Sequence, residues 1–129
     1  MANALVSERL RERLNDRAVF TAGPRPQDIT VRLPRTIDLL NAVDELAREL
    51  SMGLATIVAT DERRMPDRDF KVRYIFEPAS SSKHPLPDLF VTLLVSLAAD
   101  HPTVPSITSL VPAANWHERE MRDLFGIEP

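Results

Sequence analysis

The chain of 129 residues contains no cysteine. Without thiolates it forms no disulfide, no iron–sulfur cluster and no cysteine-based zinc site. Glycine is also scarce, at three residues, so the sequence holds no glycine-rich loop of the kind that binds phosphate groups. These two absences exclude thiolate chemistry and nucleotide-phosphate loops from this chain.

Long hydrophobic runs are missing as well. The longest apolar run, residues 86–99, is interrupted by proline and by polar side chains, and it is too short to span a bilayer. The first ten residues include Glu8 and Arg9 and lack the apolar stretch of a secretory signal. We therefore expect a cytoplasmic protein that meets a membrane only through a partner.

A strongly basic balance is absent too. The formal net charge is −3, whereas nucleic-acid binding requires a basic face. Arginines recur between Arg9 and Arg17, but acidic residues interleave with them, a pattern typical of a solvated helix face. The composition therefore predicts that nucleic acid is not a partner.

What remains is the composition of one ordinary globular domain covering residues 1–129. Hydrophobic residues make up 43% of the chain and aromatic residues only 5%, so the core must be mostly aliphatic. A chain of this length buries roughly two-thirds of its unfolded surface, which is enough for a single core.

Two segments in the first half carry apolar residues at helical spacing. The first is the segment 5–17, and the second begins after Thr36, which suits an N-cap, and ends before Gly53. The apolar positions are Val6, Leu10 and Leu14 in the first segment, and Leu39, Val43, Leu46 and Leu50 in the second.

Several other segments have the pattern of strands. The clearest is 70–77, where apolar and charged residues alternate, and 89–97 is apolar on both faces, which favours a central strand over a buried helix. The expected strands are 29–33, 54–60, 70–77, 89–97 and 107–111, separated by loops at 21–28, 61–69 and 78–87. This order predicts an α+β fold of two layers, a mostly antiparallel mixed sheet with helices on one face.

A charged helix is expected at the end of the chain. Asn115 suits its N-cap, Glu118 lies three residues later as in a capping box, and Gly126 is placed to end it. Acidic and basic residues stand four apart at Glu118–Arg122 and Arg119–Asp123, as in surface ion pairs. The expected apolar side consists of Trp116, Met121, Leu124 and Phe125. Spacing alone is typical of a solvated helix.

The exact amino-acid sequence of this segment is more informative than its spacing. The stretch Trp116 to Gly126 carries the complete pattern Trp-x-Glu-Arg-Glu-x-x-Asp-x-x-Gly, preceded by Pro-Ala-Ala at 112–114 and by Val-Pro-Ser-Ile-Thr at 104–108. In these residues the chain resembles the family of C subunits of respiratory complex I (NADH:quinone oxidoreductase). The same domain begins the large subunit of formate-hydrogenlyase-type membrane-bound [NiFe] hydrogenases. The resemblance extends weakly back to the second helix, and its Pro-Ala-Ala lead-in looks more like the hydrogenase branch.

The resemblance implies a docking role without chemistry of its own. Domains of this family carry no metal and no cofactor, and they brace the catalytic large subunit and the iron–sulfur subunit on the inner face of the cell membrane. Members of the family continue past the glycine with a tail that lies along the partner subunit, whereas this sequence stops at Pro129, so we expect it to be a fragment of a longer polypeptide. The residues expected to bind the partner are Trp116, Glu118, Arg119, Glu120, Arg122, Asp123 and Phe125, with Asn115 and Gly126 as structural caps.

Two other classes of function fit single features. A small metal-dependent enzyme would use His117 and Glu120, which stand three apart on a helix, although no third ligand is evident nearby. An adaptor or RNA-binding domain would stack bases on Phe70, Tyr74 and Phe76, although these residues share a face that the strand pattern assigns to the core.

Overall fold

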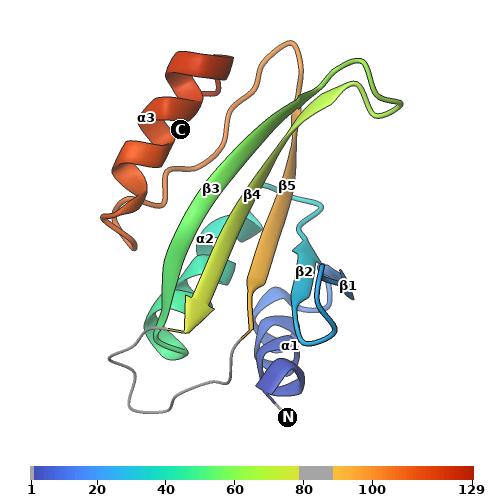
Figure 1. Ribbon diagram of the computed structural model, residues 1–129, viewed down its shortest axis with the longest axis vertical. Coiled ribbons are helices and arrows are strands. Elements are labelled where there is room, and N and C mark those ends of the chain that lie inside the picture. Colours follow the sequence, from blue (N-terminus) through green and yellow to red (C-terminus); the bar gives the residue numbers. More distant parts are fainter. Residues whose placement is uncertain (1, 79–88) are drawn as a thin grey trace.

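The computed structural model describes residues 2–78 and 89–129. Within them the chain forms an α+β fold with an open sheet, as the sequence predicts (Figure 1). The elements are α1 (Ala2–Leu14), β1 (Val19–Ala22), β2 (Ile29–Arg32), α2 (Asp38–Asp44), the π-helical turn η1 (Glu45–Glu49), β3 (Met52–Glu62), β4 (Asp69–Pro78), β5 (Val91–Ala98) and α3 (Ala114–Phe125).

The described strands form one sheet in the order β1-β2-β5-β4-β3. Only the β2–β5 pair is parallel, and the other pairs are antiparallel. The prediction that 89–97 is a central strand is therefore confirmed, because β5 lies in the middle of the sheet. The two edges differ in length, since β1 has 4 residues and β3 has 11.

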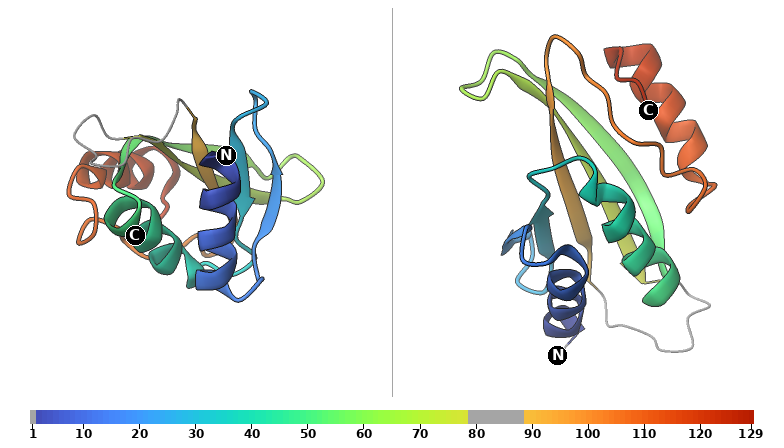
Figure 2. Two further views of the ribbon diagram at one scale, coloured as in Figure 1. Left: turned by 90° about the horizontal axis from the view of Figure 1, so that it is seen from below. Right: turned by 180° about the vertical axis from the view of Figure 1, so that it is seen from behind.

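The helices cover one face of the sheet (Figure 2). On that face β4 buries its alternate residues, which are Phe70, Val72, Tyr74 and Phe76. Seen from below, α1 and α2 lie against the middle of the sheet, and α3 lies on the same side next to β3. The core is therefore a single layer of side chains between sheet and helices.

Ion pairs fasten α1 and the turn after it to α2. The Arg13 guanidinium lies 2.6 Å from the Asp44 carboxylate, and that of Arg17 lies 2.7 Å from Asp38, which is buried. The sequence pattern indicated that the arginines of this region form a solvated helix face, but this is not true of all of them. Two of them hold secondary structure elements together.

The predicted ends of the second helix are wrong. Its N-cap is Ile37, without a side-chain hydrogen bond, instead of Thr36. The helix widens into η1, where the Leu50 N–H donates to the Glu45 carbonyl, and the chain then turns at Ser51 with φ 54°. Gly53 does not end the helix, because it already pairs with Glu77 inside the sheet.

Two further differences concern short segments. Residues 107–111 form turns instead of a strand, because the Leu110 and Val111 N–H groups both donate to the Ile107 carbonyl. β1 has no counterpart among the predicted strands, since its last two residues, Thr21 and Ala22, begin the segment 21–28 that glycine and proline mark as a loop; the loop prediction is wrong at these two positions. The connection predicted at 78–87 lies almost entirely outside the described residues.

Candidate functional site

The helix α3 begins earlier than its sequence predicts. Its N-cap is Ala113, without a side-chain hydrogen bond, and the Asn115 N–H already donates to the Pro112 carbonyl. The predicted N-cap at Asn115, with Glu118 reaching back to its amide, is therefore wrong. A turn leads into the helix in its place: the Ala114 N–H donates to the Val111 carbonyl, and Pro112 stands at the second position of this turn, where its fixed φ is favoured.

The end of α3 agrees with the sequence. Gly126 adopts a left-handed conformation with φ 70°, and its N–H donates to the Arg122 carbonyl. Glycine adopts this conformation without the steric cost that a side chain incurs. The prediction that Gly126 ends the helix is confirmed.

Glu118 is buried inside its own chain, with 3% of its surface exposed. Its carboxylate accepts hydrogen bonds from the hydroxyl of Ser106 at 2.6 Å and of Thr108 at 2.7 Å, and from the Ile107 N–H at 2.8 Å. Such charge-assisted bonds are about twice as strong as neutral ones. Glu118 therefore fastens α3 to the loop before it, a role that the paired hydroxyls at Ser106 and Thr108 signal in the sequence.

Tyr74 is buried in the core, close enough to this carboxylate to experience its charge. Burial raises the pKa of its phenol, and the negative charge of Glu118 raises that pKa further. Among the described residues the Tyr74 hydroxyl has no hydrogen-bond partner. Burial and the neighbouring charge therefore both favour the neutral phenol.

The outer face of α3 is exposed. Trp116 is 75% exposed and Leu124 is 67% exposed, although both are large and apolar. The Arg119 guanidinium lies over the Trp116 ring, 5.4 Å from its centroid. We call this surface the α3 crest, made up of Trp116, Arg119, Glu120, Arg122, Asp123 and Leu124. Apolar groups surrounded by charges on one exposed helix are typical of a contact surface.

The ion pairs expected along α3 do not form. In the part of the chain that the structure describes, no salt bridge links Glu118 with Arg122 or Arg119 with Asp123. Glu118 is turned inward to the loop, and Arg119 stacks on Trp116 instead. The charges of the crest are therefore not neutralised along the helix.

Phe125 is only half-buried, and its ring packs edge-on against Phe70 with the centroids 6.3 Å apart. It belongs mainly to the contact between α3 and the sheet. Of the residues that the sequence assigns to partner binding, Glu118 and Phe125 thus point to the chain's own core, and the other five lie at the surface.

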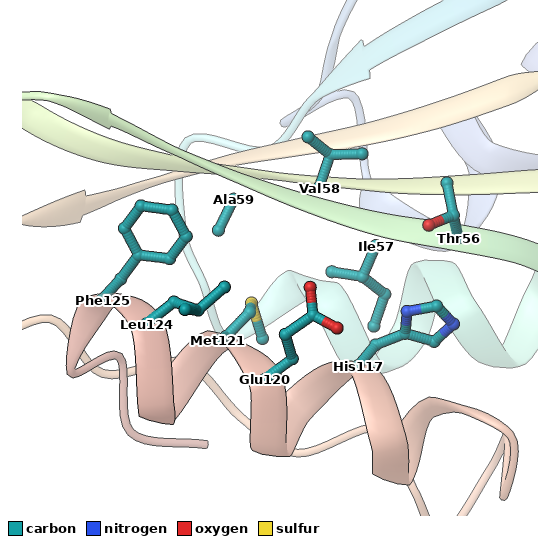
Figure 3. Close-up of a pocket in the computed structure, with 9 residues that line it drawn as sticks. All are labelled: Thr56, Ile57, Val58, Ala59, His117, Glu120, Met121, Leu124 and Phe125. Atoms are coloured by element: carbon teal, nitrogen blue, oxygen red, sulfur yellow. The ribbon is translucent and has the colours of Figure 1, made fainter.

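A groove of about 360 Å³ runs between α3 and β3 (Figure 3). Figure 3 shows Ile57 and Ala59 pointing from β3 toward the helix, with the Glu120 carboxylate and the His117 ring pointing from the helix toward the strand. The lining residues are Thr56, Ile57, Val58, Ala59, His117, Glu120, Met121, Leu124 and Phe125. This groove borders the crest directly, since Glu120 and Leu124 belong to both.

The structure bears on the two alternative classes of function. His117 and Glu120 line the same groove, but among the described residues no group of three or more His, Asp or Glu side chains is placed to hold a metal ion. Phe70, Tyr74 and Phe76 are buried in the core, as the strand pattern predicts, so they offer no platform for stacked bases.

No helix in the described ranges 2–78 and 89–129 is long and apolar enough to cross a membrane. Fold and site together define a class of protein: a two-layer α+β domain whose last helix presents a charged and apolar face outward, beside a sheet edge. The chain belongs to the family described as "Respiratory-chain NADH dehydrogenase, 30 Kd subunit", which matches residues 29–129. The resemblance found in residues 104–126 is therefore confirmed.

Relatives of two kinds are similar to this chain. The C subunit of NADH-quinone oxidoreductase from Roseiflexus sp. (strain RS-1) is 31% identical over 97% of this chain and 68% of its own length. Formate hydrogenlyase subunit 5 of Escherichia coli (strain K12) is 34% identical over 59% of this chain. The C/D subunit of NADH-quinone oxidoreductase from Shewanella woodyi is 35% identical over 74% of this chain.

The matching segments are a small part of the longer relatives. They span 12% of the formate hydrogenlyase subunit and 14% of the Shewanella protein. Both kinds of relative match at nearly the same identity, 34% and 35%, so assignment to the hydrogenase branch stays a prediction.

Two solved structures have a similar fold. A trypsin-resistant fragment of Nqo5 superposes with a TM-score of 0.74 at 28% identity, covering 99% of this chain and 95% of that one. A chain of the membrane-bound sulfane sulfur reductase, an archaeal respiratory membrane complex, gives a TM-score of 0.68 and covers 98% of this chain and 69% of that one. Its identity is 16%, and the likeness concerns the fold alone.

Proposed function

We propose that this chain is a non-catalytic docking domain of a membrane-associated redox complex, either a group 4 [NiFe] hydrogenase such as formate hydrogenlyase or an NADH:quinone oxidoreductase. It braces the catalytic large subunit and the iron–sulfur subunit, and it is peripheral on the inner face of the membrane through that complex. The relatives named as subunits of such enzymes support this proposal.

The observation that carries the proposal is the exposed α3 crest. A tryptophan that is 75% exposed beside a leucine that is 67% exposed leaves apolar surface in water, which a partner would bury. Tryptophan and arginine are also the residues most enriched where binding energy concentrates in interfaces. In the proposed complex Trp116 and Leu124 enter an apolar hollow of the large subunit, and Arg119, Arg122 and Asp123 meet charges around it.

Glu118 and Phe125 contribute to docking only indirectly in this proposal. Because Glu118 holds α3 to the loop 106–108 and Phe125 packs on Phe70, they set the position of the crest without meeting the partner. Charged groups around an interface mainly determine register and specificity. The crest charges therefore select the correct subunit, and the apolar pair supplies most of the affinity.

Charge reversal on the crest tests this function. The double variant Arg119→Glu with Asp123→Lys keeps the net charge and alters only exposed positions. After co-expression with the catalytic large subunit, we expect it to co-purify at a small fraction of the wild-type yield. The control is Glu8→Lys with Arg9→Glu, an equivalent reversal at exposed positions of α1. Equal yields for both folded variants would refute the proposed docking surface.

A further inference from the structure

The edge strand β3 lacks two of the features by which proteins protect a sheet edge, short length and lysine or proline, although α3 packs next to it. Edges are usually short, or they carry lysine or proline. β3 has 11 residues without either, and its stretch 56–60 reads Thr-Ile-Val-Ala-Thr, uncharged and rich in β-branched residues. Its bulge at Ala55 precedes this stretch. The opposite edge, β1, has only 4 residues.

The outer side of β3 has no strand partner among the described residues, since β3 pairs only with β4. Backbone N–H and C=O groups along such an edge form a template for another strand. The groove lies beside this edge, between β3 and α3. A strand added to β3 would therefore direct alternate side chains into the groove, because successive residues of a strand point to opposite faces.

The groove combines an apolar wall with one acidic group. Ile57 and Ala59 from the strand and Met121 from the helix are apolar, and the Glu120 carboxylate points between them (Figure 3). In the described part of the chain Glu120 belongs to no salt bridge. A partner strand would match this groove if it carried an apolar side chain to contact the apolar wall. A lysine or arginine two positions further along the same strand would then meet the Glu120 carboxylate.

We propose that an extended segment of the large subunit pairs with β3 at residues 56–60 as a further strand of the sheet. Its apolar side chain lies in the groove, and a basic side chain two residues away binds Glu120. The inference rests on the proposed function and names the kind of partner segment that the site takes. A second copy of this chain fits less well. Antiparallel pairing of two β3 strands centred on Val58 would bring the Glu120 carboxylates of both copies to the same interface, where like charges repel.

Amide hydrogen exchange on the co-purified complex tests the pairing. We expect the outward amides of residues 56–60 to exchange at least about tenfold more slowly in the complex than in the free chain. Glu120→Lys, at an exposed position, and Ala59→Leu, which fills the groove, should each weaken the complex about tenfold. Glu49→Lys, a reversal at an exposed position of η1, should leave the complex unchanged.

The outcomes separate the two proposals. If the complex forms and requires Trp116, but the amides of residues 56–60 exchange at the free rate, strand pairing is wrong and docking through the crest stands. If these amides become protected in the free chain as its own concentration rises, the occupant is a second copy, which also overturns the proposal. If the wild-type chain does not bind the large subunit at all, both proposals fail.

Discussion

The Glu118 carboxylate accepts a hydrogen bond of 2.8 Å from the backbone N–H of Ile107, and both residues are buried. This bond joins α3 to the loop that precedes it, at the edge of the domain where the helix otherwise rests mainly on β3. The most conspicuous acidic residue of the terminal motif is thus internal. It determines where the exposed residues of the same helix are presented.

Removing this carboxylate should destabilise the protein. Glu118→Ala leaves the Ile107 N–H buried without an acceptor and releases the hydroxyls of Ser106 and Thr108. We expect a loss of about 2–4 kcal/mol in the free energy of unfolding, measured by urea denaturation. Glu120→Ala on the same helix is exposed and should change it by less than about 0.5 kcal/mol. Similar values for the two variants would contradict the internal role of Glu118.

The left-handed end of α3 predicts a difference between two glycines. Gly126→Ala should cost about 1 kcal/mol, because alanine is strained at φ 70° even though no atom lies within 4 Å of the added methyl group. Gly53→Ala is the matched control, since its methyl group also meets open space and its φ is not positive. There we expect no loss of thermal stability, or a small gain. An equal loss at both positions would show that backbone strain is not the cause.

The contact between Arg17 and Asp38 predicts a response to acid. Hydrogen bonds from Arg17, which have the larger effect, and from Arg35 lower the pKa of Asp38 from 3.8 to about 2. Because the folded pKa lies below the unfolded one, the ionised group stabilises the fold above pH 3.8, and this contribution disappears as the pH falls toward 2. It amounts to about 1–2 kcal/mol, since both arginines are partly exposed.

Asp38→Asn isolates this effect. The wild type should be more stable than the variant near neutral pH, and the gap in the free energy of unfolding should close between pH 3.8 and 2. Asp100→Asn, at an exposed position, provides the comparison. If the gap for Asp38→Asn stays constant over that range, the arginine pairs do not stabilise the ionised form.

We expect position 74 in the core to tolerate the loss of its hydroxyl group. It is buried and unpaired among the described residues, so its removal breaks no hydrogen bond. Tyr74→Phe should leave the thermal midpoint unchanged or raise it, because an unsatisfied buried hydroxyl costs about 1–3 kcal/mol. Phe76→Leu, at an equally buried position on the same strand, should lower the midpoint. A clear loss with Tyr74→Phe would indicate a hydrogen bond to an ordered water.

Much of the fold follows from periodicity. The alternation from Phe70 to Phe76 and the two-sided apolar run of β5 lead directly to neighbouring strands in the sheet. The ends of helices were harder to predict, because Ser51 takes the left-handed conformation that the sequence suggests for Gly53. Residues 107–111 look like a strand, but their apolar residues pack under a turn that Glu118 holds.

The candidate site was predictable as a segment but not residue by residue. The charged motif identifies α3 as the distinctive element, and Trp116 lies on its exposed face. The division into an inner and an outer set depends on how the helix is rotated against β3. That rotation is determined by the hydrogen bonds of Glu118 and the contact between Phe125 and Phe70, which link residues distant in sequence or on different elements.

The sharpest test of docking is the dissociation constant between this chain and the catalytic large subunit, compared for Trp116→Ala and Met65→Ala. Both residues are large, apolar and exposed, but Met65 lies in the β3–β4 turn, away from α3. We predict that Trp116→Ala weakens binding by at least about tenfold and that Met65→Ala leaves it within about twofold. Equal constants for the two folded variants would contradict docking through the α3 crest.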